Sequence, residues 1–363
     1  MGPDRHAFRH ILVIKPSSLG DVTHALPVLN GLRRRYPGAK IGWLISTSCR
    51  ELLEGHPFID ELIPFDRRRY GQMSRSIRAT AEFTEFVHGL RARRFDLVID
   101  LQGLFRSGFL AWASGAATRI GFARAREFAW MFYTHRIAPG DPDEHAVTKN
   151  FRVAALLGFE HVPITFGLHV QPAGRARAHA LLAEAGITLG EPYAVLAPGA
   201  RWQTKKWPAA NMGIVAMHLR ARHGLRIVLA GGPDEAADCK AVQAVAGEPV
   251  VNLCGRTGLR DLVALIEGAA ILVSNESGPM HIAAALGRPV VGVVGPTNPR
   301  RNGPYSPNSR IVQAGLECSP CYLRKRAQCP HDLACMTIVG PDRVMEAADE
   351  LLRPCAEPAS TTR

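Results

Sequence analysis

The stretch ILVSNESGPMHIAAALGRPVVGVVGPTNP, residues 271–299, decides the fold. It contains two continuous apolar runs, 271–274 and 290–294, and each is followed by a turn rich in polar residues, glycine or proline. Such runs are typical of strands that are buried on both faces of a parallel sheet. The polar turn 274–278 opens a helical segment between them. The stretch therefore predicts a strand–helix–strand unit of an α/β fold.

Similar apolar runs recur along the whole chain, with helical segments between them. In the second half we predict strands at Tyr193–Ala197, Arg226–Ala230, Val250–Leu253, Ile271–Ser274 and Val290–Val294. In the first half we predict strands at Ile11–Lys15, Lys40–Ile45, Glu61–Phe65, Asp96–Leu101 and His161–Leu168. A helix is expected from Val22 to Tyr36, because three arginines occupy its last turn and Pro37-Gly38 follows it. This alternation predicts an α/β protein built from doubly wound sheets.

The length of 363 residues favours two domains. We predict an N-terminal Rossmann-like domain over residues 1–172, a linker over 173–190 that contains an alanine-rich helix, and a C-terminal Rossmann-like domain over 191–352. A tail over 353–363 follows, and we expect its end to be disordered. Ligands of open α/β sheets bind beyond the carboxyl ends of the strands. Polar residues that directly follow the predicted strands are therefore the candidates for a site.

The composition bounds the function. The formal net charge is +12, and 47% of the residues are hydrophobic, which is ordinary for a globular protein. The charge favours anionic partners, although solubility alone also explains it. No apolar run is long enough to span a membrane, and the polar first ten residues do not resemble a secretory signal, so we expect a cytoplasmic protein. Scattered basic residues without a motif argue against nucleic acid, and the lack of G-x-G-x-x-G after the first strand argues against a dinucleotide oxidoreductase.

Charged residues follow two strands of the second half. Lys205 and Lys206 stand just before a predicted helix start, where lysines suit a diphosphate, although a solvated lysine pair would look the same. Asp234 and Glu235 follow a Gly-Gly turn. An acidic residue there suits the hydroxyls of a ribose, and it equally suits the N-terminal cap of the next helix.

The polar turn of the opening stretch is the most informative. Glu276, Ser277 and Gly278 begin a helix whose N–H groups would face an anion. His281 lies one turn further on. An isolated histidine at such a place is more often a satisfied core residue than a catalyst.

The first half offers a loop and several basic residues. The stretch KPSSLGDVTHALP, residues 15–27, has the shape of a phosphate-binding loop, yet it has one glycine, Gly20, and a carboxylate, Asp21, where the anion would sit. Asp100 and Gln102 are polar residues at the end of the predicted strand Asp96–Leu101. Basic residues of the same half are Arg67, Arg68, Arg69, Arg124 and Arg126, and surface arginines alone prove little.

Four of the eight cysteines cluster in one segment: Cys318, Cys321, Cys329 and Cys335. In a cytosolic protein this spacing suggests a metal before a disulfide, and four thiolates can hold Zn or Fe. Since the protein would then fill all four positions, the metal would be structural. The alternative is a family-specific loop with reduced cysteines.

Taken together, these segments resemble the bacterial ADP-heptose:lipopolysaccharide heptosyltransferases, glycosyltransferase family 9. The resemblance covers roughly Ile11 to Leu352. It is carried, in this order, by KPSSLGDVTHALP, DLQGLFRSG, AREFAWMFYTHRI, HAV, KKWP, AGGPDE and NESGPMHIAAALGRPVVGVVGPTNP. It implies a GT-B type fold, in which two Rossmann-like domains face a central cleft, the N-terminal one for the acceptor and the C-terminal one for the ADP-sugar. It implies an inverting transfer of heptose that needs no metal for the chemistry.

The resemblance also implies roles for single residues. Asp21 matches the base that deprotonates the acceptor hydroxyl, and Lys205 matches the lysine that neutralises the leaving diphosphate. The residues implied on the donor side are Lys206, Glu235, Glu276, Ser277, Gly278, Met280 and His281. Glu276 stands where the family usually has aspartate. The residues implied on the acceptor side are Ser18, Gly20, Arg67, Arg68, Arg69, Asp100, Gln102 and Arg126.

The acceptor stays open at this point. The arginine-rich loop and AREF resemble the first heptosyltransferase, which adds heptose to Kdo, whereas the cysteine segment resembles the second, which adds heptose to heptose. A same-fold transferase that modifies a protein or another glycan is the alternative. The implied partners are an ADP-sugar, an acidic lipid-linked saccharide and the inner membrane surface, which a basic protein without a span would reach by electrostatics.

Overall fold

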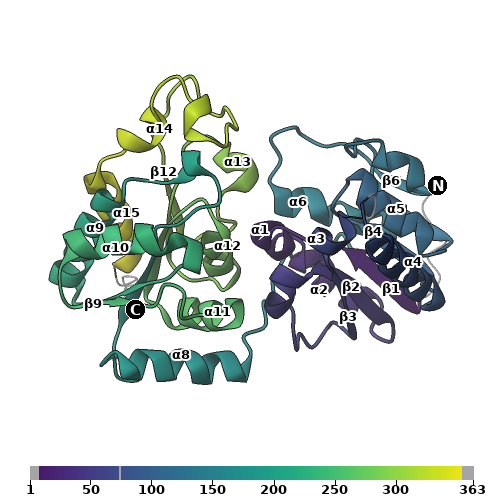
Figure 1. The fold of residues 1–363 in the computed structure, drawn as a ribbon, viewed down its shortest axis with the longest axis horizontal. Helices are drawn as coiled ribbons and strands as arrows, with labels where there is room; N and C mark the ends of the chain where they lie inside the picture. Colours follow the sequence, from purple (N-terminus) through teal and green to yellow (C-terminus); the bar gives the residue numbers. More distant parts are fainter. Residues whose placement is uncertain (1–7, 73–74, 354–363) are drawn as a thin grey trace, which may run out of the picture. The chain divides into compact units, whose positions relative to one another are not determined.

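The computed structural model describes residues 8–72 and 75–353 of the chain. The chain divides into two compact units, Met1–Gln171 and Pro172–Arg363. Each unit contains one six-stranded sheet with helices packed on it (Figure 1). The predicted α/β class with two doubly wound parallel sheets is confirmed.

The sheet of the first unit has the strand order β3-β2-β1-β4-β5-β6, and all of its ladders are parallel. The order reverses between β1 and β4, which lie side by side with Ile14 opposite Asp100. At such a switch point the loops leave the strand ends in opposite directions, which opens a crevice for a ligand. The strands are β1 (His10–Ile14), β2 (Lys40–Ser46), β3 (Glu61–Phe65), β4 (Leu97–Asp100), β5 (Thr118–Phe122) and β6 (His135–Ile137).

The helices of the first unit form two groups. The helices α3, α4 and α5 pack in sequence against one another, and α2 packs against α6 and α7. The α-helices are α1 (Leu19–Thr23), α2 (Leu26–Arg35), α3 (Arg67–Tyr70), α4 (Ile77–Ala92), α5 (Phe105–Ala113), α6 (Ala146–Phe151) and α7 (Val153–Leu157), and the 3-10 helices are η1 (Thr47–Leu52) and η2 (Ala129–Phe132).

The sheet of the second unit has the strand order β12-β11-β10-β7-β8-β9 and is also parallel throughout. Its switch point lies between β7 and β10, with Ser274 opposite Ala197. The strands are β7 (Tyr193–Ala197), β8 (Arg226–Leu229), β9 (Val250–Asn252), β10 (Ile271–Asn275), β11 (Val290–Val293) and β12 (Ser309–Val312).

In the second unit α9 packs against α10 and α15, and α8 packs against α11 (Figure 1). Gly224 ends α9 in the left-handed region, with φ 65°, and its N–H bonds the carbonyl of Arg220, as is common at a helix C-terminus. The helices are α8 (Pro172–Glu184), η3 (Gln203–Lys205), α9 (Ala209–His223), η4 (Pro233–Glu235), α10 (Ala236–Ala246), α11 (Leu259–Gly268), α12 (Gly278–Ala285), α13 (Pro299–Asn302), η5 (Arg326–Gln328), α14 (Ala334–Thr337) and α15 (Pro341–Leu352).

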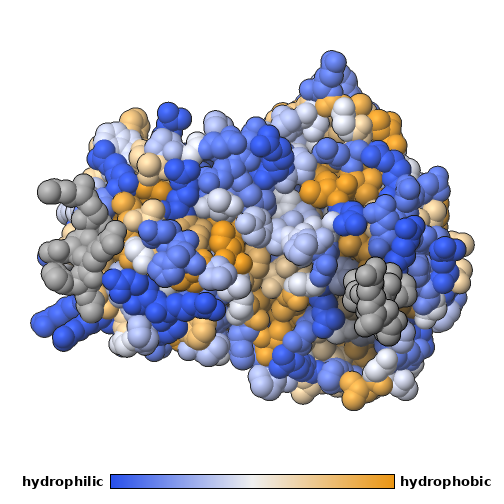
Figure 2. Space-filling model, turned by 180° about the vertical axis from the view of Figure 1, so that it is seen from behind, coloured by the Kyte–Doolittle hydropathy of each residue, from blue (hydrophilic) through white to orange (hydrophobic). Residues whose placement is uncertain are grey.

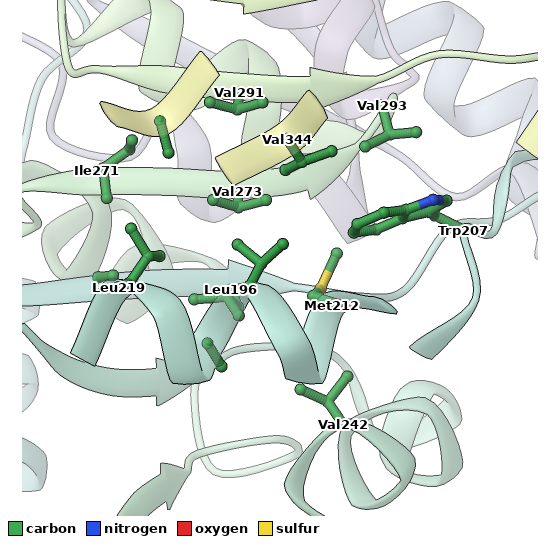
Figure 3. Close-up of a cluster of buried hydrophobic side chains, with 14 of the residues drawn as sticks. Leu196, Trp207, Met212, Leu219, Val242, Ile271, Val273, Val291, Val293 and Val344 are labelled. Carbon is green, nitrogen blue, oxygen red and sulfur yellow. The ribbon is translucent and has the colours of Figure 1, made fainter. Parts of the chain in front are cut away.

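The apolar runs form the cores. In the second unit the strand residues Leu196, Val273 and Val291 pack with Met212 of α9 and Val344 of α15 (Figure 3). All of them are buried. Burying one such side chain stabilises the fold by about 1.5–3 kcal/mol. Because helices cover both faces of the sheet, the strands need apolar residues at successive positions, which is the pattern seen in the sequence.

The structure corrects two expectations and adds three strands. The segment His161–Leu168 forms no strand, because it joins no ladder in either sheet of the described chain. The helix expected over 22–36 is two helices, α1 and α2, separated at His24-Ala25. Strands β5, β6 and β12 were not expected. The alanine-rich helix expected within the linker 173–190 is present as α8, and most of the expected tail lies outside the described residues.

No helix in the described part of the chain is long and apolar enough to cross a membrane. The face seen in Figure 2 is mostly hydrophilic, with separate hydrophobic patches.

Candidate functional site

The switch point of the second sheet brings two predicted residues together. Lys205 ends η3 in the segment after β7, and Glu276 follows β10 directly. Lys205 Nζ donates to Glu276 Oε1 over 2.8 Å, and both side chains are largely buried, with 14% and 5% of their surface exposed. An ion pair that is removed from water in this way interacts more strongly than one on the surface. The two residues therefore form a fixed charged pair at the strand ends.

The other oxygen of Glu276 is also engaged. Thr297 Oγ1 donates to Glu276 Oε2 from the turn after β11. Burial raises the pKa of Glu276, while the nearby Lys205 ammonium opposes that rise. Because both carboxylate oxygens accept hydrogen bonds within the protein, this group orders Lys205 and the turn at Thr297.

Asn275 ties the loops of this site together, and sequence reasoning missed it as a site residue. It is fully buried. Its Nδ2 donates to the Pro198 carbonyl over 2.6 Å, and its Oδ1 accepts from the backbone N–H of Trp207 over 3.0 Å. These bonds hold both ends of the segment that carries Lys205. The available signal for Asn275 and Thr297 was their place at the end of a buried strand and in the turn after one.

Two further predicted residues lie on neighbouring loops. Lys206 Nζ donates to Asp238 Oδ2 of α10 over 2.6 Å. Glu235 Oε2 accepts from the N–H of Gly232 over 2.8 Å, so its carboxylate closes the Gly-Gly turn. A Cβ placed at Gly199 would lie 1.9 Å from Glu235 Oε1. The loop after β7 therefore needs glycine at 199 to approach Glu235.

The start of α12 offers hydrogen-bond donors. Ser277 is the N-cap residue and Gly278 the first helical residue. Ser277 Oγ is buried and has no hydrogen-bond partner among the described residues. Buried polar atoms are normally paired, so this orphan suits a ligand at the helix start. Met280 and His281 are buried, and Met280 Sδ would lie 2.6 Å from a Cβ on Gly292 of β11. Met280 thus packs on the sheet.

Asp21 lies at the start of α1, after β1. Its Oδ2 accepts from Ser18 Oγ over 2.6 Å and from the Ser18 N–H over 3.0 Å, and Lys15 Nζ is 3.9 Å from its Oδ1. The Asp21 side chain is 46% exposed. Gly20 is buried under the same turn. The loop therefore presents an oriented and accessible carboxylate.

The end of β4 lies next to this loop, because β1 and β4 are neighbours. Lys15 Nζ donates to the Leu101 carbonyl over 2.8 Å. Asp100 is fully buried, accepts from Tyr133 Oη over 2.6 Å, and has its pKa raised by burial. These contacts make Asp100 a support for the loop, out of reach of a ligand. Gln102 is partly exposed, and its buried Oε1 has no partner among the described residues.

The predicted basic residues of the first unit differ in their surroundings. Arg67, Arg68 and Arg69 form α3 and are exposed, and Arg69 binds Glu82 of α4 through two nitrogens. Arg67 and Arg68 have no ion pair in the described chain. The backbone N–H of Arg126 donates to the Gly103 carbonyl over 3.0 Å, which places Arg126 beside the loop after β4.

The HAV segment lies close to the Asp21 loop. The rings of His24 and His145 are 5.2 Å apart, and Asn150 Nδ2 donates to the His24 carbonyl over 3.2 Å. Segments that are far apart in the sequence thus meet at the switch point of the first sheet.

The cysteine segment is only loosely gathered. Burial raises the pKa of Cys335 to about 11, and the other three thiols add to the rise. Their chemistry suits Zn or Fe. However, the one group of three or more metal-binding side chains with ligand atoms within 4.8 Å in the described chain is His218, His223 and Asp349. The four sulfur atoms would have to move closer together to bind one metal ion.

Comparison with known proteins identifies the class. The crystal structure of a glycosyltransferase family 9 protein from Veillonella parvula is similar to this chain with a TM-score of 0.81 and 26% identity, over 97% of this chain and 98% of that one. The structure of the E. coli heptosyltransferase WaaC with ADP gives a TM-score of 0.74 and 26% identity, over 94% and 99%. The fold and the strand-end site thus define a glycosyltransferase of the GT-B fold.

The sequence identifies the family. The pattern of glycosyltransferase family 9 (heptosyltransferase) matches residues 83–331, well over half of the chain. Lipopolysaccharide heptosyltransferase 1 of Salmonella typhimurium is 32% identical over 317 residues, which cover 85% of this chain and 94% of that protein. The chain belongs to glycosyltransferase family 9 and is a heptosyltransferase. The family expected from the sequence motifs is confirmed.

Proposed function

We propose that this heptosyltransferase transfers heptose from ADP-heptose to the Kdo of the lipopolysaccharide inner core. The observation that carries the proposal is the buried Lys205–Glu276 pair next to the orphan hydroxyl of Ser277 at the start of α12. A nucleoside diphosphate is the chemical group that such a helix start with adjacent lysines suits best. The similar E. coli protein was solved with ADP, and a relative at 32% identity is named heptosyltransferase 1.

The second unit holds the donor in this proposal. The N–H groups at Gly278 and the Ser277 hydroxyl bind diphosphate oxygens, and Lys205 neutralises the charge that grows as ADP leaves. Glu276 keeps Lys205 in place and lies close to the donor sugar. Lys206, which is bound to Asp238, adds a further hydrogen-bond donor, and Glu235 lies near the ribose. Met280 and His281 belong to the first turns of α12 and are buried, so they hold the start of this helix in place.

The first unit holds the acceptor, with Asp21 as general base. The acceptor hydroxyl gives its proton to the Asp21 carboxylate while its oxygen attacks the anomeric carbon of the heptose. The bond between that carbon and the diphosphate breaks, ADP leaves with the electron pair, and the anomeric centre is inverted. The two bonds from Ser18 fix the orientation of the Asp21 carboxylate.

The acidic acceptor meets exposed arginines. Arg67, Arg68 and Arg126 bind its carboxylate and phosphate groups, and Gln102 can donate or accept at a sugar hydroxyl. Since such an acceptor is lipid-linked, we propose that the chain docks peripherally on an anionic membrane surface by electrostatics. Binding to anionic vesicles that does not weaken with added salt would contradict this.

We also propose a structural Zn or Fe held by Cys318, Cys321, Cys329 and Cys335. The support is four thiols in one short segment, three of which act on the pKa of the fourth, Cys335. The metal would hold this segment closed and takes no part in the transfer. Elemental analysis of the purified protein tests it, with the Cys318→Ser/Cys321→Ser variant as the comparison. Metal-free wild type that melts at the same temperature as the variant would remove this proposal.

ADP release tests the function directly. The purified protein is given ADP-heptose with Kdo-lipid A, and separately with core that already carries the first heptose. Release that depends on the Kdo acceptor supports the proposal. Release only with the heptosylated core moves the activity to the second heptose. Binding of ADP-heptose without release from either would point to a protein or another glycan as acceptor.

A further inference from the structure

The cysteine-rich segment lies against the loops of the proposed donor site. Three hydrogen bonds join it to the segment after β7: Thr204 Oγ1 to the Leu323 carbonyl at 2.6 Å, Gln203 N–H to the Arg324 carbonyl at 3.1 Å, and Arg326 N–H to Gln203 Oε1 at 3.1 Å. Two more join it to the turn after β11, where Tyr322 N–H binds the Pro296 carbonyl and Ser319 Oγ binds the Gly295 carbonyl. The segment therefore contacts both sides of the Lys205–Glu276–Thr297 group.

One indole ring brings two cations together in this contact. Lys205 Nζ lies 4.4 Å from the centre of the Trp202 ring, and Arg324 Cζ lies 4.8 Å from the same centre. The two cationic groups are therefore at most about 9 Å apart. This is within the Debye length of about 10 Å at 0.1 M salt, so both act on an anion bound near Lys205.

The balance of charge and the contact with Trp202 together single out Arg324. Lys205 is paired with Glu276, Lys206 with Asp238, and Arg326 with Asp332. Each pair is close to neutral, and a diphosphate that approaches them meets little net positive charge. Arg324, by contrast, is exposed and has no carboxylate partner within the described ranges. Its contact with the indole face orients the guanidinium without cancelling its charge.

We propose that Arg324 is a diphosphate-binding residue of the donor site, supplied by the cysteine-rich segment and oriented by Trp202. The ligand class is a nucleoside diphosphate, so this inference rests on the proposed function. A guanidinium suits the role because its planar fork can donate two parallel hydrogen bonds to phosphate oxygens. Lys205 then keeps its bond to Glu276 in the resting protein, while Arg324 supplies the uncompensated charge that attracts the donor.

The test compares the binding of ADP and of AMP by calorimetry. Arg324→Ala should weaken ADP by about tenfold or more, the size expected for a lost charge-assisted bond, and AMP by less than about threefold. Arg324→Lys should recover part of the ADP affinity, because it keeps the charge and loses the fork. Lys325→Ala removes an equal charge from the next residue and should bind ADP like the wild type. Trp202→Leu should reproduce part of the Arg324→Ala loss.

Two outcomes overturn the proposal while the function stands. In the first outcome, the wild type binds ADP well and Arg324→Ala binds it with the same affinity. In the second, Arg324→Ala loses affinity for ADP and for AMP to the same extent, which marks a purely structural role. Equal melting temperatures of wild type, Arg324→Ala and Lys325→Ala establish that folding is intact. A wild type that binds neither ADP nor ADP-heptose overturns the proposed function, and this result is distinct because it appears before any substitution.

Discussion

The two sheets each place a carboxylate at their switch point, and the two carboxylates have opposite surroundings. Asp21 follows β1, is 46% exposed, and accepts two bonds from Ser18. Glu276 follows β10, is 5% exposed, and accepts from Lys205 and Thr297. The same topology thus produces one accessible carboxylate and one that is enclosed by the protein.

The difference shows how one fold can serve two tasks. A general base must reach a hydroxyl of its substrate, so it needs an exposed oxygen and a fixed orientation. A carboxylate that holds a lysine in place needs the reverse, namely burial and two oxygens that already accept hydrogen bonds within the protein. We therefore propose that Asp21 takes the proton and that Glu276 positions Lys205. Each of the following experiments either breaks this contrast or makes it sharper.

The largest effect is expected for Asp21→Asn. The amide keeps the size of the side chain but cannot take the proton, so turnover should fall by about 10²–10⁴-fold. The affinity for ADP-heptose should stay within about twofold, because the donor is assigned to the other unit. Single-turnover kinetics and donor binding measure the two quantities. A variant that binds donor poorly and turns over normally would reverse the assignment.

The next effect concerns Lys205→Met, which leaves Glu276 buried without its cation. Donor affinity should fall by about 10–100-fold, and the loss of one partner of a buried pair should cost about 3–5 kcal/mol of stability. The double variant Lys205→Met/Glu276→Gln should regain much of the stability and none of the donor affinity. Thermal melting and ADP binding separate these outcomes. Normal donor affinity in Lys205→Met would remove Lys205 from the site.

The stability loss of Lys205→Met should depend on pH. Burial raises the pKa of Glu276 above 4.5, so the folded chain binds that proton more tightly than the unfolded chain does. Protonation of Glu276 therefore stabilises the folded chain at a pH below the pKa that Glu276 has in the unfolded chain. This stabilisation is lost as the pH rises through the pKa that Glu276 has in the folded chain. Removing Lys205 raises the folded pKa further. The gap in melting temperature from wild type should therefore be smaller near pH 5 than near pH 8, and a gap that shrinks with rising pH would contradict the assignment.

The sequence predicts nine of the twelve strands of the described chain and misses the other three. The strands Glu61–Phe65 and Tyr193–Ala197 were predicted to the residue, because continuous apolar runs between turns have few other uses in an α/β fold. Strands β5, β6 and β12 were missed. They are three to five residues long, and each contains an arginine. Their conformation depends on hydrogen bonds to a neighbouring strand, and the residues of the short segment alone do not predict such pairing.

The site was predictable in its residues but not in its contacts. Position after a buried strand picked out Lys205 and Glu276, yet their bond joins residues that are 71 positions apart. Asp100 also stands at a strand end in the sequence, yet it is fully buried. It accepts a hydrogen bond from Tyr133, which lies between β5 and β6, and no sequence pattern links these two residues. The pairing of Trp202 with Arg324 is likewise a product of packing between distant segments.

A smaller effect is expected for Gly199→Ala. The added Cβ would lie 1.9 Å from Glu235 Oε1, so the Glu235 carboxylate must move away from the Gly-Gly turn. Overpacking of this kind costs about 1–3 kcal/mol, and donor affinity should fall by up to about tenfold while acceptor KM is unchanged. Gly232→Ala is the matched control, because a Cβ there meets no atom within 4 Å. Equal donor affinity in the two variants would separate Glu235 from the donor.

The smallest effect concerns the three arginines of α3, and it tests the acceptor side of the contrast. Arg69 is already bound to Glu82, whereas Arg67 and Arg68 have no ion pair in the part of the chain that is described. Exposed charge contacts are each worth up to about 1 kcal/mol, so Arg67→Ala and Arg68→Ala should each raise the acceptor KM by about two- to fivefold. Arg69→Ala should change it less, because its guanidinium stays with Glu82. Steady-state kinetics with Kdo-lipid A at saturating donor measures the three values, and added salt should reduce the differences. A larger effect at Arg69 than at its neighbours would mean that the acceptor displaces Glu82, and no effect at any of the three would move acceptor binding away from α3.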